Sequence, residues 1–431
     1  MLNDVMRRAL TVRVGGEPVA APGLRHFTGE ADGRPVRYHL RVDPDGAGLV
    51  VVNASAACRL SPSGVLVAAE LLGGAADEAV VRRLLATFRG VDGARAAADV
   101  ARVREALRRM TREGGCGPLV SLDESGATAR RHALSAPLGA DLWVEAEVPA
   151  ERLRLLWDAG VPHAVFALAP GASAEPLVAA VERAEDLGLV AGVRARATDL
   201  TGDGLLERLA AAGLDHLDLG WAGSEAGVHD ALFGKGDFDR ALRLVESSRA
   251  LELFVSAVIP LTAPWAYDLD DEVASLAAAG VRAAAVWAVA VDADEGTDGA
   301  VPRRALRQVA TIAEEAADRR GLAVTWCAPV ERDPARTLAE QVCRGPRVVG
   351  EATVRVEADG AVVPPVGPPG SAGRLGVDAW ASIWGHEAFR AWREETADLP
   401  RCGTCPGLAV CRDGCPAEPA TWARRGPEVA R

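Results

Sequence analysis

The N-terminal part of the chain shows a period-two alternation of apolar and polar residues, which is typical of a β-strand with two different faces. The two interleaved sets are Val36, Tyr38 and Leu40 against Arg37, His39 and Arg41. A turn at 43–46 and two more strands at 49–52 and 57–60 follow, and then helical patterns over 65–72, 76–88 and 94–110. Three short strands followed by three helices predict a winged-helix-like domain over residues 35–112, preceded by an N-terminal extension over 1–34.

A strand-then-helix rhythm runs through residues 138–330. The predicted strands are 142–148, 164–168, 191–197, 217–221, 253–259, 283–291 and 323–327, with helices between them. Alternating strands and helices predict an α/β domain with a parallel sheet and right-handed crossovers. We expect the sheet to close into a partial or full (β/α) barrel, and an open doubly wound sheet is the alternative.

Several charged residues fall within these predicted strands. With period-two alternation, two residues share a face of the first strand, two share a face of the third, and one lies similarly on the fourth: Glu145 and Glu147, Arg194 and Arg196, and Asp218. Both faces of a barrel strand are usually buried, and buried charges need partners. We hypothesise that these residues meet in the lumen of the barrel. The alternatives are that they lie near strand ends in solvent or line a polar ligand pocket.

Composition and charge narrow the functional classes. The 431 residues suit two or three domains, and the net charge of -12 argues against a nucleic-acid backbone as the main partner. The N-terminus lacks the apolar stretch of a signal peptide, and no apolar run approaches the ~20 residues that span a membrane. We therefore expect a cytoplasmic protein that binds neither nucleic acid nor membrane.

The last region, 343–431, ends in a dense group of cysteines. After a predicted hairpin over 354–363 and a tryptophan-rich helix, four thiols follow the spacing C-x2-C-x5-C-x3-C: Cys402, Cys405, Cys411 and Cys415. In a cytoplasmic chain such clustering indicates metal binding, and four thiolates suit one Zn²⁺ ion or one [4Fe–4S] cluster equally well. Cys343 is either a fifth ligand or a lone buried thiol.

Taken together, the three regions resemble a radical SAM peptide maturase. The first resembles a PqqD-like peptide-recognition domain, with the segment LSPSGVLVAAELL (60–72) at its strand-to-helix junction. The second resembles the radical SAM partial barrel, best over 212–223 and 229–242. The third, with its spaced cysteines and the upstream Cys343, resembles a SPASM auxiliary-cluster domain. The resemblance covers most of the chain after residue 35.

The chain departs from this family where the radical chemistry takes place. The family ligates its catalytic cluster with a C-x3-C-x2-C loop after the first barrel strand, whereas here 142–148 passes almost directly into the predicted helix 150–159 without a cysteine. The segment Ala167–Ala172 also replaces the family's Gly-Gly-Glu-Pro turn, which holds the amino group of SAM. Without three thiolates SAM cannot be cleaved reductively. We expect no catalytic SAM cluster and a degenerate relative of the family.

The resemblance also implies where a peptide binds. In a PqqD-like domain the groove lies between the third strand and the third helix, which here places five residues at the peptide: Ala57, Arg59, Leu60, Val103 and Leu107. A small sheet with a free edge can accept an extended segment as an added strand. The alternative is a purely structural role for this domain.

Three functional hypotheses follow. The first is a non-catalytic protein that binds the leader of a ribosomally made precursor peptide and presents it to the modifying enzymes of that (RiPP) pathway, similar to the recognition proteins of families such as the daptides. The second is an enzyme of another class that uses the C-terminal centre or the polar lumen to modify peptides. The third is a scaffold whose metal only holds the C-terminal segment together.

Overall fold

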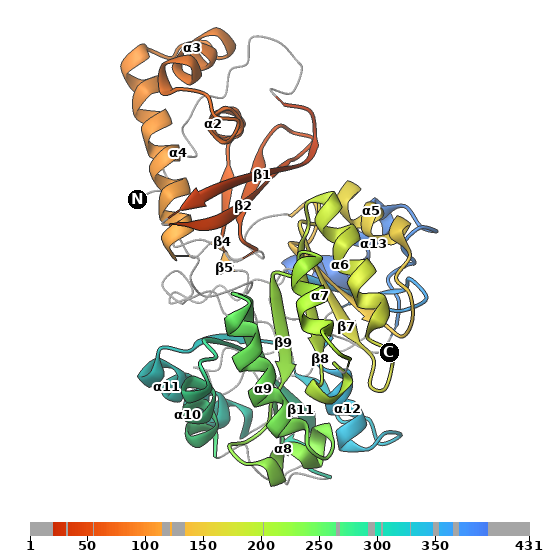
Figure 1. Ribbon diagram of the computed structural model, residues 1–431. Coiled ribbons are helices and arrows are strands. Elements are labelled where there is room, and N and C mark those ends of the chain that lie inside the picture. Colours follow the sequence, from red (N-terminus) through yellow and green to blue (C-terminus); the bar gives the residue numbers. More distant parts are fainter. Residues whose placement is uncertain are drawn as a thin grey trace.

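The computed structural model describes residues 20–31, 33–54, 56–113, 121–122, 134–200, 202–263, 268–291, 298–302, 305–327, 329–347, 353–364 and 370–394. Figure 1 shows a smaller N-terminal domain, with its own sheet and three helices, next to a larger α/β domain.

The N-terminal domain is built on a five-stranded sheet in the order β1-β2-β3-β4-β5. Its strands are β1 (Gly23–Ala31), β2 (Arg34–Val42), β3 (Gly48–Val52), β4 (Ala56–Leu60) and β5 (Ser121–Leu122). Strands β1 to β4 pair antiparallel, whereas β5 pairs parallel with β4 at Ala56 and Ala57. The sheet therefore contains one strand more at each edge than the three strands predicted from the sequence.

Three helices cover one face of this sheet: α2 (Pro62–Leu72), α3 (Asp77–Thr87) and α4 (Gly93–Glu113). Ser61 begins α2 as its N-cap, because its hydroxyl accepts a hydrogen bond from the Gly64 N–H at 3.2 Å. Val36 and Leu40, on the apolar face of β2, join the buried side chains of the helices in one core. Each such buried side chain contributes roughly 1.5–3 kcal/mol.

The larger domain is a curled, mainly parallel sheet in the order β12-β11-β10-β9-β8-β7-β6-β15-β16, with β13 and β14 paired to β11. The strands are β6 (Gly139–Val144), β7 (His163–Leu168), β8 (Val190–Ala195), β9 (His216–Gly220), β10 (Phe254–Leu261), β11 (Ala283–Val291), β12 (Val301–Pro302), β13 (Ala323–Trp326), β14 (Val330–Glu331), β15 (Thr353–Val356) and β16 (Val362–Val363). In the described part of the chain the two ends of this sheet do not pair. The architecture is thus a half-barrel, which is one of the two closures predicted.

Helices cover the outer face of the half-barrel (Figure 1). They are α5 (Ala150–Asp158), α6 (Glu175–Leu187), α7 (Leu205–Ala211), α9 (Asp237–Ala250), α10 (Leu269–Ala279) and α11 (Leu306–Arg320), with a short 3₁₀ turn, η2 (Ala197–Asp199). Helix α8 (Ala226–Phe233) instead packs Leu232 and Phe233 against inward-facing side chains such as Trp287. Among the helices of the described residues, none combines the length and the apolar character needed to cross a bilayer.

The chain then returns to the first strand of the half-barrel. Helix α12 (Leu338–Arg344) is followed by β15, which lies parallel beside β6, and by β16, which pairs antiparallel with β15. The predicted hairpin therefore forms, and its turn closes with a hydrogen bond from the Gly360 N–H to the Glu357 carbonyl at 2.8 Å. Two short helices, α13 (Trp380–Trp384) and α14 (Glu387–Glu394), end the described chain.

The polar face of β2 attaches the N-terminal domain to the half-barrel. Arg37 donates to the Leu189 carbonyl at 3.2 Å, and His39 Nε2 lies 2.6 Å from the Gly188 carbonyl oxygen. Arg41 Nη1 donates to three carbonyl oxygens, those of Ala136, Pro137 and Gly160, at 2.9, 3.1 and 3.2 Å. These carbonyls directly precede β6, β7 and β8, so the N-terminal domain sits at the amino ends of the barrel strands.

Two glycines and a shared apolar core make this contact close. A Cβ atom at Gly188, where φ is +83°, would lie 2.7 Å from Nδ1 of His26, and one at Gly160 would lie 2.8 Å from Cδ of Arg41. Leu49 of β3 belongs to the same apolar cluster as the half-barrel. The two domains therefore pack as one body.

We predict that His39 makes this contact sensitive to acid. Burial lowers the pKa of His39 from 6.5 to about 4, although its bond to the Gly188 carbonyl opposes the shift. The folded chain thus keeps His39 neutral where the unfolded chain takes up a proton. The part of the folding free energy that comes from keeping His39 neutral is fully present above pH 6.5. It is lost as the pH falls from 6.5 towards 4, at about 1.4 kcal/mol per pH unit.

The test compares the free energy of unfolding of the wild type and His39→Gln, measured by urea titration at pH 7, 5.5 and 4.5. Glutamine keeps a donor but does not titrate, so the variant should lose less stability on acidification. Equal losses in the two proteins would show that His39 does not control the acid response.

Candidate functional site

The strands of the half-barrel alternate between residues that face the helices and residues that face the lumen. Outward side chains such as Leu142, Phe166 and Val193 belong to the apolar core beneath the helices. The inward positions carry the buried polar side chains: Asp141, His163, Arg194, His216, Asp218 and Ser256. The two-residue period of a strand thus gathers these polar groups in the lumen.

Arg194 lies among these groups and binds two carboxylates. Its Nη1 donates to Asp141 Oδ2 at 2.8 Å, and its Nη2 lies 3.8 Å from Asp218 Oδ2. Burial alone would lower the pKa of Arg194, but the two carboxylates outweigh it and raise the pKa. Because each of these three side chains is at most 10% exposed, each charge depends on its partners to remain in the lumen.

Two histidines extend the network towards the amino ends of the strands. His163 Nε2 and His216 Nε2 are 2.9 Å apart, and His216 Nδ1 lies 2.9 Å from Asp218 Oδ1, which also accepts from the Ser256 hydroxyl. Burial would raise the pKa of Asp218, but His216 and the other partners outweigh it and lower the pKa to about 2. Burial, with His216 nearby, lowers the pKa of His163 well below 6.5.

The space that His216 occupies depends on a glycine in the neighbouring strand. A Cβ atom at Gly192 of β8 would lie 2.1 Å from the His216 ring. Any other residue at this position would displace the imidazole, and with it the partner of Asp218. Gly192 is therefore part of the lumen network although it contributes no polar side chain.

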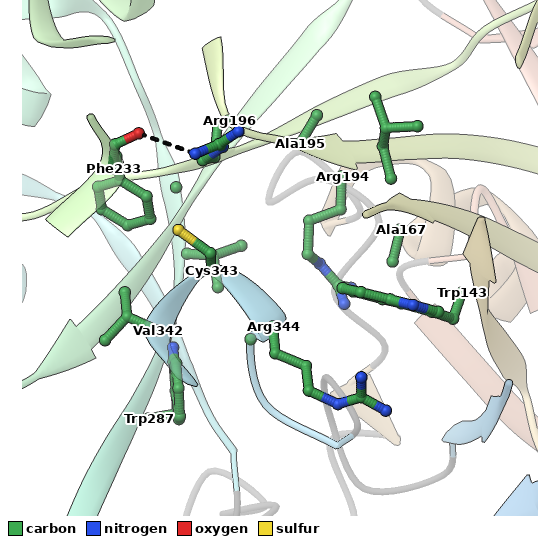
Figure 2. Close-up of a pocket in the computed structure, with 14 residues that line it drawn as sticks. Trp143, Ala167, Arg194, Ala195, Arg196, Phe233, Trp287, Val342, Cys343 and Arg344 are labelled. Carbon is green, nitrogen blue, oxygen red and sulfur yellow. Dashed lines mark hydrogen bonds between the residues drawn. The ribbon is translucent and has the colours of Figure 1, made fainter. Parts of the chain in front are cut away.

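A cavity of about 30 Å³ lies at the carboxyl ends of the strands, next to Arg194 (Figure 2). Its polar lining comes from three arginines, two tryptophans and one cysteine: Arg194, Arg196, Arg344, Trp143, Trp287 and Cys343. Its volume suits a group of one or two water-sized units rather than a large cofactor. Two guanidinium carbons, those of Arg344 and Arg355, lie 5.1 and 4.6 Å from the centre of the Trp143 ring, in reach of cation–π attraction.

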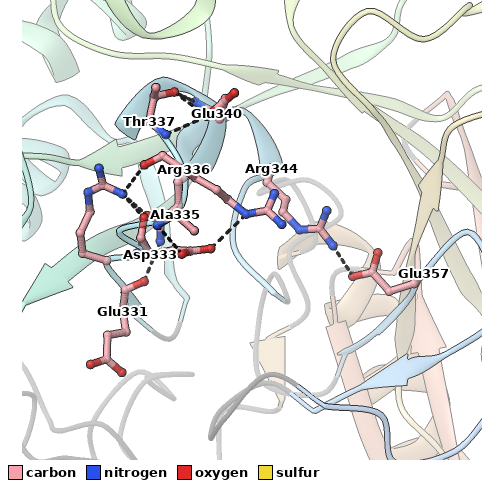
Figure 3. A network of polar contacts seen from close by, with 10 residues as sticks. Glu331, Asp333, Ala335, Arg336, Thr337, Glu340, Arg344 and Glu357 are labelled. Atoms are coloured by element: carbon pink, nitrogen blue, oxygen red, sulfur yellow. Dashed lines mark hydrogen bonds and ion pairs between the residues drawn. The ribbon is translucent and has the colours of Figure 1, made fainter.

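Helix α12 carries Cys343 and Arg344 to this cavity, and both of its ends are fixed (Figure 3). At its start, the Glu340 N–H donates to the Thr337 hydroxyl while the Thr337 N–H donates to the Glu340 carboxylate, which is a capping box. At its end, Arg344 donates to Glu357 in the turn after β15 at 3.0 Å. These contacts hold one wall of the cavity in place.

The structure brings together part of the charged set predicted for the lumen. Arg194 and Asp218 meet there, as described above. Arg196 follows β8 and lines the cavity, where it binds both oxygens of Asp199 at 2.6 Å. Arg194 and Arg196 thus both line the cavity, the first from β8 and the second from just after it.

The two glutamates of this set lie elsewhere. Glu145 and Glu147 are exposed in the loop after β6, because the strand ends at Val144. Glu147 pairs with Arg183 at 3.1 Å on the outside of the domain. The acidic partner of Arg194 on this strand is Asp141 instead.

Several members of the site escaped the sequence analysis. Asp141 has the same strand parity as Glu145, so a strand starting at 139 rather than 142 would have included it. His163 and His216 begin β7 and β9, one residue before the predicted starts. Nothing in the sequence distinguished Trp143 and Trp287 as site residues, because an apolar residue in a strand fits a core position as well as a cavity wall.

The residues predicted to contact a peptide lie within the N-terminal domain and its contact with the half-barrel. Leu60, Val103 and Leu107 are at most 8% exposed and belong to the apolar core of the domain. Ala57 is buried in the cluster shared with the half-barrel, and Arg59 is half-buried. The edge of β4 on which a peptide was predicted to pair is occupied by β5 at Ala56 and Ala57.

The cysteines predicted to bind metal, Cys402, Cys405, Cys411 and Cys415, lie outside the described residues. Cys343 lines the cavity and donates to the Leu232 carbonyl at 3.4 Å, and burial raises the pKa of its thiol to about 11. Within the described ranges, no group of three or more His, Cys, Asp or Glu side chains is arranged as a metal site.

The cluster and the SAM that the family resemblance implies do not fit the residues present. The connection between β6 and α5 is the loop Glu145–Pro149, which contains no thiol. The lumen beside it holds the Arg194 network, and the cavity is too small for SAM.

No protein-family model matches the chain, and no curated protein sequence matches it. Among solved structures, Streptococcus suis SuiB bound to S-adenosylmethionine has a TM-score of 0.50 and 12% identity, over 91% of this chain and 96% of that chain. SuiB bound to precursor peptide SuiA gives 0.47 and 11%, over 90% and 96%. anSMEcpe with bound AdoMet and Kp18Cys peptide gives 0.44 and 11%, over 65% and 92%. At this identity, the likeness to SuiB is one of fold.

We predict that Asp141 and Arg194 contribute to stability as a pair. Asp141→Leu leaves Arg194 buried with only its longer contact to Asp218, and should cost about 3 kcal/mol in the free energy of unfolding. The double variant Asp141→Leu with Arg194→Met removes both charges and should cost clearly less than the sum of the single changes. A double-mutant cycle by urea unfolding measures this coupling, and additive losses would show that the two residues act independently.

Proposed function

We propose that this chain is a non-catalytic relative of radical SAM peptide maturases that recognises the leader of a ribosomally made precursor peptide, as in daptide-type pathways, and presents it to RiPP-modifying enzymes. In this proposal the N-terminal domain is a PqqD-like recognition element. The segment with Cys402 to Cys415 is a SPASM-like domain that binds one Zn²⁺ ion or one [4Fe–4S] cluster. The order of the domains and the likeness of the fold to SuiB support the proposal.

The observation that carries the recognition role is the edge of β4. In the described residues, strand β5 pairs with two of the five residues of β4, Ala56 and Ala57. An extended leader can form a longer ladder along the same edge, with more backbone hydrogen bonds. Leader binding would then displace β5 from this edge. Strand β5 competes with the leader at a high effective concentration, because it belongs to the same chain.

The β6–α5 connection supports the non-catalytic part of the proposal. A radical SAM enzyme needs thiolates that hold a cluster at this point, and the loop Glu145–Pro149 offers two exposed glutamates instead. Next to it, Arg194 is bound to Asp141 and Asp218. Opening this lumen for a cofactor would expose or unpair charges that now stabilise one another.

A second candidate is an enzyme of another class. The linked side chains His163, His216, Asp218 and Ser256 favour it, because buried histidine–carboxylate pairs are common at catalytic sites. These four side chains do not line the cavity, however, so none of them directly contacts a substrate bound there. We therefore rank recognition first.

We predict that weakening β5 strengthens leader binding. Ser121→Pro with Leu122→Pro removes the backbone donors of β5, and the loss of one ladder hydrogen bond, about 1 kcal/mol, should tighten leader binding about fivefold. Fluorescence anisotropy with the labelled leader of the cognate precursor measures this change. The control, Ser121→Ala with Leu122→Ala, keeps both donors and should bind like the wild type. Failure of the wild type to bind the leader would overturn the recognition role.

We also predict that the C-terminal thiols hold a metal. After anaerobic purification, the chain should contain about one zinc ion or one four-iron cluster. Cys402→Ser with Cys405→Ser should abolish this content, whereas Cys343→Ser, in the cavity, should leave it unchanged. Elemental analysis with sulfide determination and the visible spectrum decide between the metals. A wild-type chain without either metal contradicts the prediction, and a second iron cluster would revive the radical chemistry.

A further inference from the structure

The side chains that line the cavity at the carboxyl ends of the strands include no oxygen acceptor. Its polar side chains are the guanidinium groups, the two indoles and the Cys343 thiol. The Trp143 indole N–H already donates to Glu145 Oε1 at 3.0 Å, and the Cys343 S–H donates to the Leu232 carbonyl. No Asp, Glu, Asn, Gln, Ser or Thr is among the residues that line it in the described chain. A group that enters this cavity therefore meets donors and needs to supply acceptors.

Some of these donors are buried without a partner. The Nε atom of Arg194 makes no hydrogen bond, its Nη2 has only the 3.8 Å ion pair with Asp218, and the side chain is only 10% exposed. The indole N–H of Trp287 is also without a partner, although the residue is fully buried. Leaving such donors unsatisfied costs roughly 1–3 kcal/mol each, so buried polar groups are normally paired. The cavity is thus prepared for a ligand that accepts hydrogen bonds.

The shape and the walls of the cavity favour a carboxylate. The volume of about 30 Å³ admits a small group, and the surrounding surface is apolar, with Phe233 and Val258 beside the indole rings. Figure 2 shows the Trp287 ring on one side of the cavity and Arg194 and Trp143 on the other. A flat group with two acceptor oxygens matches such a pair of donors, and guanidinium groups bind carboxylates particularly well.

The place of the cavity indicates where such a carboxylate comes from. The N-terminal domain contacts the amino ends of β6, β7 and β8 through Arg37, His39 and Arg41. The cavity lies at the opposite, carboxyl ends of the strands, among residues such as Gly220 and Gly345. A peptide held by its leader on one side leaves its far end free to reach the other. That end is the only main-chain carboxylate of a linear peptide.

We propose that this cavity binds the C-terminal carboxylate of the peptide whose leader the N-terminal domain recognises, with Arg194 and Trp287 as the donors. This inference rests on the proposed function for the source of the carboxylate. A free carboxylic acid or inorganic phosphate presents similar acceptors, and the experiment separates these sources from the peptide end.

Isothermal titration calorimetry with the full chain compares the precursor peptide with the same peptide bearing a C-terminal amide. The acid form should bind about tenfold more tightly, because the amide lacks the negative charge and keeps only one of the two acceptor oxygens. N-acetylalanine should compete with the C-terminal carboxylate of the peptide and so reduce this difference in affinity, whereas N-acetylalaninamide should not. Equal binding of the acid and amide forms, or competition by phosphate but not by N-acetylalanine, overturns the inference.

A matched pair of variants assigns the effect to the cavity. Trp287→Phe removes the pyrrole part of the indole with its N–H. It should reduce severalfold the ratio of the affinities for the acid and amide forms of the peptide. Trp380→Phe, on α13, removes an indole N–H that also lacks a partner but lies outside the cavity lining, and should leave the ratio unchanged. The leader alone serves as the control for the proposed function: if it binds while acid and amide do not differ, recognition stands and the carboxylate site fails.

Discussion

The polar face of β2 is the contact on which the arrangement of the molecule depends. Each second residue of this strand faces the helices of its own domain, and the residues between them, Arg37, His39 and Arg41, bind carbonyl oxygens at the base of the half-barrel. Carbonyls at the ends of helices and strands need donors, and here a neighbouring domain provides them. The same alternation therefore builds one core and fixes the position of the other. As a result, the β4 edge and the lumen cavity belong to one body with a defined geometry.

Much of the fold was predictable, because it follows from short-range patterns. Strand Ala283–Val291 has the predicted bounds, and the other predicted barrel strands differ from theirs by a few residues. The site was less predictable, because it depends on where a strand ends. Glu145 has the correct parity for the lumen but lies one residue beyond β6, while Asp141 lay before the predicted start. Contacts between distant strands, such as Asp141 with Arg194, have no local signature.

The middle of the half-barrel differs in character from its two ends. Ion pairs and imidazoles fill the middle of the half-barrel, where they stabilise the sheet without leaving room for a large cofactor. The two ends differ: the proposed leader recognition uses a strand edge on one side, and the proposed carboxylate site is the hollow on the other. A fold alone does not fix a function, so both proposals rest on the side chains present and not on the likeness of fold.

The close packing around His216 also limits how this lumen can change over evolutionary time. A Cβ at Gly192 would collide with the imidazole, which pairs with Asp218, which in turn neighbours Arg194. A substitution at any one of these positions loses stability until others change with it. Several replacements would therefore have to occur together to hollow out this lumen, so its packed state is easier to keep than to change.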